Sequence, residues 1–262
     1  MSESDRILVS QENGIKRITI NDPEALNAVD RPMAIRFAEL LQEAATDDSR
    51  VVIITGAGNA FCSGANVKKM GSDDGGFSDV AEFLQRITNP AIRALREMPK
   101  PVIARVPGVA TGVGCNYALA CDIRIASTKA RFGQVFSRSG LVPDGGSSYV
   151  LPRMVGYAQA FELMVTGEVF GAEKALQLGL VNRVVAPDEL DSVVDEIAGK
   201  LAAGPALAFA GIKRNLNFGE THSLAETLDQ EAVEQKLCMQ SHDFKEGTTA
   251  FVEKRPARFE GR

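Results

Sequence analysis

The sequence predicts an α/β protein with largely parallel strands. Its apolar, β-branched runs each end in a glycine-rich loop or lead on toward a helix, which is the order of elements typical of parallel sheets. From Tyr157 onward the pattern changes to successive helical segments. The chain has 262 residues, of which 45% are hydrophobic and 24% charged, so it is long enough to bury a sizeable core.

The first elements follow from local signals. Alternating apolar and polar residues around Asn13-Gly14 predict a β-hairpin over Ile7 to Ile20. Asp30, followed by Pro32, predicts the start of a helix, and MAIRFAELLQEAATDD continues it at three- and four-residue spacing. The run VVIIT predicts a buried strand that ends in the glycine-rich loop GAGNAFCSGAN.

The pattern then repeats. A helical region from about Asp79 to Glu97 precedes the strand PVIARV, and this strand leads into a second glycine-rich loop, PGVATGVG. The helix NYALACD and the strand DIRIAS follow. Beyond Tyr157 we expect one short strand, at LVNRVV, and residues 201–262 read as wholly helical.

Composition excludes several classes of function. The net charge is −5 and no Lys/Arg-rich block is present, which argues against a nucleic-acid partner. The apolar runs are short, and the first residues are polar and acidic, so we expect no membrane span, no leader peptide and a cytoplasmic protein. The four cysteines form no CxxC pair, which predicts free buried thiols and no metal site. Both histidines lie late in the chain, so acid–base work is expected from a carboxylate.

The two glycine-rich loops are the first candidates for chemistry. Glycine permits positive φ and a close approach of the backbone, which leaves amide N–H groups free to donate. The second loop leads directly into a helix N-terminus, which favours negative charge. Side by side, the loops could hold one oxyanion between two backbone donors.

These segments resemble the crotonase (enoyl-CoA hydratase/isomerase) superfamily over nearly the whole chain. The matching stretches are NDPEALNAV, VVIITGAGNAFCSGANVKKM, KPVIARVPGVATGVGCNYALACDIRIAS, ARFGQVFSRSGLVPDGGSSYVLPRMVG and EKALQLGLVNRVV. The resemblance implies a spiral of ββα turns over residues 1–200, with the acyl-CoA site, and a helical trimerisation region over 201–262. It also implies a homotrimer or a dimer of trimers, with coenzyme A as part of the substrate and no other cofactor.

The same resemblance assigns roles to individual residues. The amides of Ala65, in SGAN, and Val113, in TGVG, are expected to form the oxyanion hole; valine stands where glycine is usual and adds bulk. Lysines could meet the phosphates of coenzyme A, although most surface lysines do not. The residues expected to bind substrate are Ala28, Ser63, Gly64, Lys68, Asn116, Phe136 and Lys254, the last from this subunit or a neighbouring one.

Asn116 and Phe136 stand where enoyl-CoA hydratases of the superfamily carry two catalytic glutamates. Neither can act as a base near neutral pH, so a two-glutamate hydratase is disfavoured. Asp144, in GLVPDGGSSYVLPR, matches the acid that ring-1,2-epoxyphenylacetyl-CoA isomerases and some enoyl-CoA isomerases carry in this loop. A single base suits a 1,3-proton shift, and apolar neighbours should bring its pKa toward the working pH. The sequence therefore favours an acyl-CoA double-bond isomerase with catalytic Asp144.

Four alternatives remain open. Asp144 precedes Gly145-Gly146 and could cap a helix that begins near Gly145, alone or in addition to catalysis. The chain could be a hydratase-type lyase that works without the usual glutamates. It could use Asp144 as a nucleophile, as the 4-chlorobenzoyl-CoA dehalogenase branch does, although it lacks that branch's tryptophan and nearby histidine. Lastly, it could bind acyl-CoA without catalysing a reaction.

Overall fold

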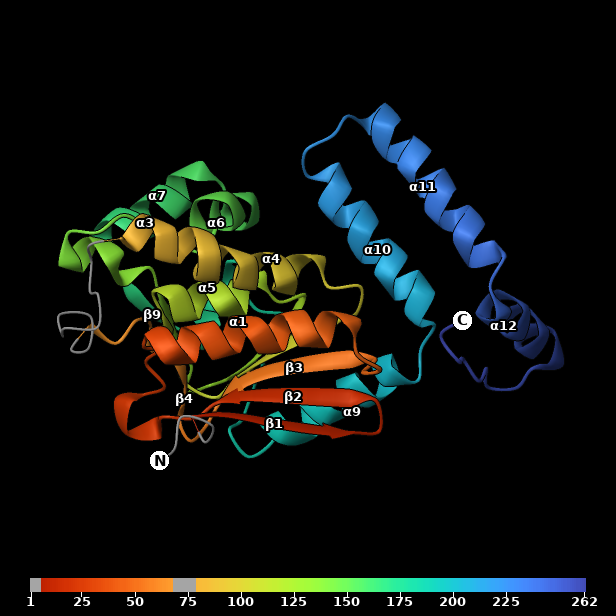
Figure 1. Cartoon of the computed structure of the whole chain (residues 1–262), viewed down its shortest axis with the longest axis horizontal. Coiled ribbons are helices and arrows are strands. Elements are labelled where there is room, and N and C mark those ends of the chain that lie inside the picture. The colour runs from red at the N-terminus through yellow and green to blue at the C-terminus, as the bar shows by residue number, and fades with distance from the viewer. Residues whose placement is uncertain (1–5, 68–78) are drawn as a thin grey trace.

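The structure is a computed structural model that describes residues 6–67 and 79–262. Within this part the strands form two sheets (Figure 1), one in the order β1-β2-β3-β5-β7-β10 and one in the order β4-β6-β8-β9. The strands of the larger sheet are β1 (Ile7–Glu12), β2 (Ile15–Ile20), β3 (Val51–Gly56), β5 (Val102–Val106), β7 (Ile123–Ser127) and β10 (Arg183–Val185). Those of the smaller sheet are β4 (Ala60–Cys62), β6 (Val109–Thr111), β8 (Arg131–Gly133) and β9 (Val169–Gly171).

Helices fill most of the remaining chain. Up to the middle of the chain they are η2 (Pro23–Ala25), α1 (Arg31–Thr46), α3 (Val80–Phe83), the π-helical η3 (Leu84–Thr88), α4 (Asn89–Glu97), α5 (Val113–Ala120) and η4 (Val135–Ser139). They continue with α6 (Ser147–Val155), α7 (Tyr157–Thr166), α8 (Ala172–Gln177), α9 (Leu190–Ala202), α10 (Ala206–Gly219), α11 (Leu224–Met239) and α12 (His242–Glu253).

The order of strands shows a repeating ββα unit. β3, β5 and β7 lie side by side and parallel in the larger sheet, and each is followed by one strand of the smaller sheet, where β4, β6 and β8 are also parallel. A helical segment comes after each strand pair. The chain therefore winds as a spiral of ββα turns, and each turn stacks on the one before it. The predicted α/β fold is confirmed.

The central strands of the larger sheet, β3, β5 and β7, are buried on both faces, which is the usual state of a parallel sheet. Every residue of β3 is buried. Val52 and Ile54 point into the main core with α1 and α4, whereas Val51 and Ile53 point to the opposite face, where they pack with α9 (Figure 1). Successive residues of a strand face opposite sides, so the uninterrupted apolar run VVIIT fits a strand with two buried faces.

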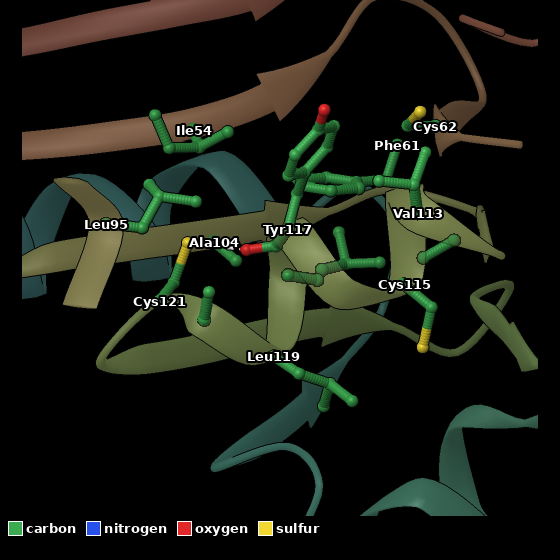
Figure 2. Close-up of a cluster of buried hydrophobic side chains, with 14 of the residues drawn as sticks. Ile54, Phe61, Cys62, Leu95, Ala104, Val113, Cys115, Tyr117, Leu119 and Cys121 are labelled. Carbon is green, nitrogen blue, oxygen red and sulfur yellow. Dashed lines mark hydrogen bonds between the residues drawn. The ribbon is translucent and has the colours of Figure 1, made fainter. Parts of the chain in front are cut away.

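Helix α5 lies in the centre of the main core. All eight of its residues are buried and most of them are apolar, as expected for a helix surrounded by protein. Figure 2 shows Val113, Cys115 and Tyr117 of α5 among the side chains of neighbouring strands, including Phe61 of β4. The position and direction of α5 are therefore fixed by packing along its whole length.

Most of the predicted elements are confirmed. β1 and β2 form the expected hairpin, with Ile7 opposite Ile20. Asp30 caps α1 by accepting a hydrogen bond from the Met33 amide. The helical region after Asp79 is also present, although it contains the π-turn η3 just before Pro90, which lacks the N–H needed for a regular α-helical bond.

Three expectations about element bounds were wrong. The helix predicted as NYALACD begins earlier, at Val113. The short strands of the smaller sheet were expected as loops or were not expected at all. The C-terminal region is not wholly helical. Helix α12 ends at Glu253, the next residue, Lys254, has the left-handed conformation, and Pro256 disfavours helix in the residue before it. No described helix is both long and apolar enough to cross a membrane.

Candidate active site

The amide of Ala65 is oriented by a short pairing with the chain before α1. Val29 donates its N–H to the main-chain oxygen of Gly64 over 2.9 Å and accepts the N–H of Asn66 over 2.8 Å. In such a parallel bridge the residue between the two partners, Ala65, directs its own N–H and C=O to the opposite side. Ala65 is exposed, so its amide is presented away from Val29 and is accessible to a bound molecule.

The two glycine-rich loops lie against each other. A β-carbon on Gly64 would be 3.8 Å from Cα of Gly112 and 3.1 Å from the main-chain oxygen of Thr111. The Thr111 hydroxyl also donates to the main-chain oxygen of Ser63 over 2.9 Å. Gly64 has φ of +107°, a value that side chains rarely adopt. The predicted proximity of the two loops is confirmed by these contacts.

Val113 opens α5, and its N–H is among the helix-terminal groups that have no partner within the helix. The residue before it, Gly112, has φ of 55° and ψ of −133°, a conformation that is essentially restricted to glycine. This conformation sets the direction in which the chain enters the helix. The start of α5 at Val113 therefore lies beside the loop that carries Ala65.

The expectation that Asp144 caps a helix through its side chain was wrong. Helix α6 begins at Ser147 and its N-cap is Gly146, with no side-chain capping bond. Gly145 and Gly146 both have positive φ, 54° and 76°, and this double turn moves the helix start two residues away. What Asp144 offers the helix is its main-chain oxygen, which accepts from the Ser147 amide over 3.1 Å and from the Ser147 hydroxyl over 3.0 Å.

The carboxyl group of Asp144 is left without a donor. Its Oδ1 is buried and, among the residues that the structure describes, has no hydrogen-bond partner. Burial raises the pKa of Asp144 to about 6, and no cation within residues 6–67 and 79–262 opposes the shift. A carboxyl group in this state can take up and release a proton near neutral pH, and this is the property required of a proton shuttle.

Asn116 contacts the main chain of this acid, and Phe136 lies near the start of the helix that carries Asn116. The Asn116 side chain is only 2% exposed and donates from Nδ2 to the main-chain oxygen of Asp144 over 2.9 Å. Phe136 lies on η4, and its Cζ is 4.0 Å from where a β-carbon on Gly112 would stand. The structure thus places Asp144 against Val113 and Asn116 of α5, about thirty residues earlier in the chain, with Phe136 near the start of the same helix.

The other predicted substrate-binding residues divide into two groups. Ala28 and Ser63 lie by the first loop, where the Ser63 amide donates to the main-chain oxygen of Leu26 over 3.0 Å. Lys254 is exposed at the end of α12, and Figure 1 shows α12 at the opposite end of the molecule from β4. Within one chain Lys254 is not near the loops, so its predicted role requires a neighbouring subunit. Lys68 lies outside the described residues.

Sequence reasoning missed Gln134 as part of this site. Its side chain is 2% exposed and donates from Nε2 to Oδ1 of Asn116 over 2.7 Å. The signal available in the sequence was a polar residue directly after the buried end of a strand, FGQ, although the partner lies 18 residues away.

Three cysteines and Asp122, which were expected to have structural roles, are placed accordingly. Cys62, Cys115 and Cys121 are free and buried, and burial raises the pKa of each thiol to about 12, so they are poor nucleophiles. Asp122 fixes the start of β7: its Oδ2 accepts from the Val102 amide and from Lys213, each over 2.8 Å.

Comparison with known proteins shows the family to which the chain belongs. A family model described as enoyl-CoA hydratase/isomerase matches residues 10–262. The chain is 38% identical to the 1,2-epoxyphenylacetyl-CoA isomerase of Escherichia coli K12, over 98% of both chains. It is 36% identical to the crotonyl-CoA hydratase of Syntrophomonas wolfei, over 97% of this chain and 98% of that protein. The crystal structure of an enoyl-CoA hydratase from Bacillus anthracis superimposes with a TM-score of 0.92 at 30% identity, covering 98% of this chain and 100% of that one.

Proposed function

Since the chain belongs to the enoyl-CoA hydratase/isomerase family, we propose that it is an acyl-CoA double-bond isomerase that uses Asp144 as its single proton shuttle. The observation that carries this proposal is the unpartnered Oδ1 of Asp144, in a carboxyl group whose pKa is raised to about 6 by burial. Asn116 and Phe136, which cannot act as bases, occupy the positions at which the two-glutamate hydratases have their acids.

In the proposed reaction the thioester oxygen accepts hydrogen bonds from the Ala65 and Val113 amides. Ionised Asp144 removes a proton from one carbon of the acyl chain, and the electron pair moves into the enolate, whose negative oxygen the two amides stabilise. Protonated Asp144 then returns the proton to the carbon two positions along, and the double bond has moved. Each amide of such a pair typically contributes about 2.7–4 kcal/mol.

The pocket composition supports a proton shift over the addition of water. Phe136 places an apolar ring near Gly112, where a hydratase would need a group that orients water. Asn116 has both polar atoms of its amide engaged by protein partners.

The test is to replace Asp144 by Ala and by Asn and to assay both isomerisation and the addition of water. With 3-hexenoyl-CoA as probe, we expect isomerisation to 2-hexenoyl-CoA to fall by about 10²–10⁴ in kcat, the usual contribution of a general base. The matched control is Asp188→Asn, an exposed acid outside the site, which should match the wild type. Undiminished isomerisation in Asp144→Ala would overturn the proposal.

Three other outcomes would each indicate one of the alternative functions. Addition of water to 2-hexenoyl-CoA by the wild type, without isomerisation, would make the chain a hydratase. Binding of acyl-CoA without any exchange of its α-protons in deuterated water would make it a non-catalytic binding protein. A mass adduct of Asp144 with an acyl or aryl group would indicate a nucleophile.

A further inference from the structure

We propose that Asn116 and Gln134 are positioning residues that hold Asp144 at a fixed place relative to the Val113 amide, and that they do so through the main chain of Asp144. The inference rests on the proposed role of Asp144 as the base. It gives Asn116 a different role from the substrate contact expected from the sequence.

The contacts form a continuous chain of hydrogen bonds across three segments. Gln134, directly before η4, donates to Oδ1 of Asn116 over 2.7 Å, and Asn116, on α5, donates to the main-chain oxygen of Asp144 over 2.9 Å. The direction of each bond is fixed by chemistry. The Asp144 carbonyl can only accept, so the amide nitrogen of Asn116 must face it; the Asn116 oxygen then faces Gln134, which must donate.

The Asp144 carbonyl is held from two sides. Asn116 reaches it from α5, while the amide and hydroxyl of Ser147 reach it from the first turn of α6. Asn116 and Gln134 are each only 2% exposed, so solvent does not readily replace a lost partner. Leaving a buried donor or acceptor unpaired typically costs about 1–3 kcal/mol. The carbonyl of Asp144 is therefore strongly anchored.

The loop also packs tightly onto the first turn of α5. A β-carbon on Gly145 would lie 3.3 Å from the Cβ and Nδ2 of Asn116 and 3.6 Å from Cγ2 of Val113. The residue next to Asp144 therefore sits against the same helical turn that begins with the Val113 amide. This close packing is a second observation, independent of the hydrogen bonds, that ties the Asp144 loop to α5.

The hydrogen bonds that position Asp144 do not involve its carboxyl group. All the anchoring bonds end on the main chain of Asp144, and among the described residues none ends on Oδ1. Val113 and Asn116 lie three residues apart on one buried helix, so the donor and the anchor move together. This chain of hydrogen bonds can thus fix the position of the carboxyl group without changing its pKa.

This arrangement predicts a distinctive kinetic signature. In Asn116→Ala, kcat for 3-hexenoyl-CoA should fall by about 10–10²-fold, since small misplacement of a catalytic group costs this much. KM should change by less than about threefold, and the pKa seen in the pH profile of kcat/KM should stay where it is in the wild type. A substrate-binding role would instead raise KM with kcat unchanged, and a purely structural role would lower stability alone. Either result would overturn the inference.

A second variant protects the test against loss of folding. Gln134→Met keeps the length of the side chain but cannot donate, so it removes the bond to Asn116 together with the side-chain hydrogen bond to the Cys115 thiol, and leaves the bond from Asn116 to Asp144 in place. We expect a smaller fall in kcat, of about threefold to tenfold, again with KM unchanged. The matched control is Asn182→Ala, which removes an amide oxygen that accepts from the Arg124 main chain over 2.8 Å, at the start of β7. It should leave kcat as in the wild type.

Asp144→Ala, assayed alongside, separates the two proposals. If Asp144→Ala is inactive and both Asn116→Ala and Gln134→Met keep the wild-type kcat, the inference fails and the proposed function stands. If Asp144→Ala retains full activity, the proposed function fails and the inference fails with it.

Discussion

Gly114 lies so close to Cys62 that a β-carbon on Gly114 would be 2.1 Å from the main-chain oxygen of Cys62. The contact joins α5 to β4, the strand that leads into the loop of Ala65. Only a residue without a side chain permits this approach, so Gly114 sets how closely the two halves of the proposed oxyanion hole can stand.

Gly114→Ala should therefore be strongly destabilising, by about 3 kcal/mol or more, because the backbone of β4 has no room to move within the core. The matched control is Gly199→Ala, on the exposed side of α9 with no atom near the added methyl group, which should stabilise by about 0.5–1 kcal/mol. Urea unfolding of both variants measures the difference, and similar stabilities would contradict the close packing.

Gly112→Ala tests the backbone direction at Val113. The added methyl group has space, with its nearest neighbours 3.8–4.0 Å away, but the φ of 55° and ψ of −133° are strained for alanine. We expect the Val113 amide to turn away and kcat to fall by about 10²-fold. Gly179→Ala, which also has positive φ and open space but lies after α8, should lose stability only; equal activities in the two variants would exclude a catalytic role for this amide.

The activity should follow the ionisation of Asp144. The base is active when ionised, and burial raises its pKa to about 6, so kcat/KM should rise about tenfold per pH unit below pH 6 and become constant above it. The measurement is a pH profile with 3-hexenoyl-CoA. A profile that stays flat down to pH 4.5 would show that the reaction does not depend on this carboxyl group.

The free energy of unfolding should also depend on the ionisation of Asp144, but it should fall as pH rises, whereas the activity increases. The pKa of Asp144 is higher in the folded protein than the ordinary value of 3.8, so the folded state binds more protons and stability is lost as pH rises from about 4 to 6. Asp144→Asn removes this loss and should be more stable than the wild type by about 1–2 kcal/mol at pH 8, a value reduced for partial exposure, with no difference near pH 3.5. Thermal unfolding at both pH values tests the sign.

Lys213 should contribute much of the attachment of α10 to the core. Its Nζ donates to Asp122 and to the main-chain oxygen of Leu95, each over 2.8 Å, and burial lowers its pKa while raising that of Asp122. Lys213→Met leaves a mostly buried acid without its cation, with the Val102 amide as a remaining donor, and should cost about 2–3 kcal/mol. In the double variant with Asp122→Asn part of this loss should be recovered; strictly additive losses in urea unfolding would argue against coupling.

Much of the larger sheet could be predicted because its strands carry a readable pattern. Burial alternates strictly along β2 of the hairpin before α1, and β3 is a continuous β-branched run with two buried faces. The smaller sheet could not be predicted in the same way. β4, β6 and β8 have three residues each, too few to show a period, and they lie inside or beside segments dominated by glycine.

At the site, residue types could be predicted but contacts could not. Asp144 stood out because acids were absent from two other positions, yet its carboxyl group does not cap α6, since two successive glycines with positive φ redirect the chain. No local pattern links Gln134 to Asn116, or Asn116 to Asp144, because each pair is joined only when β8, α5 and α6 pack together.

The absence of a charged partner at Asp144, within the described residues, has a consequence for the conditions in which the protein works. Dissolved ions weaken attractions between separated charges, but they do not undo the exclusion of water from a carboxyl group. The proton affinity of Asp144 comes from burial alone. Its working pH range should therefore be the same in dilute buffer and in concentrated salt, whereas the surface ion pairs of the same molecule weaken.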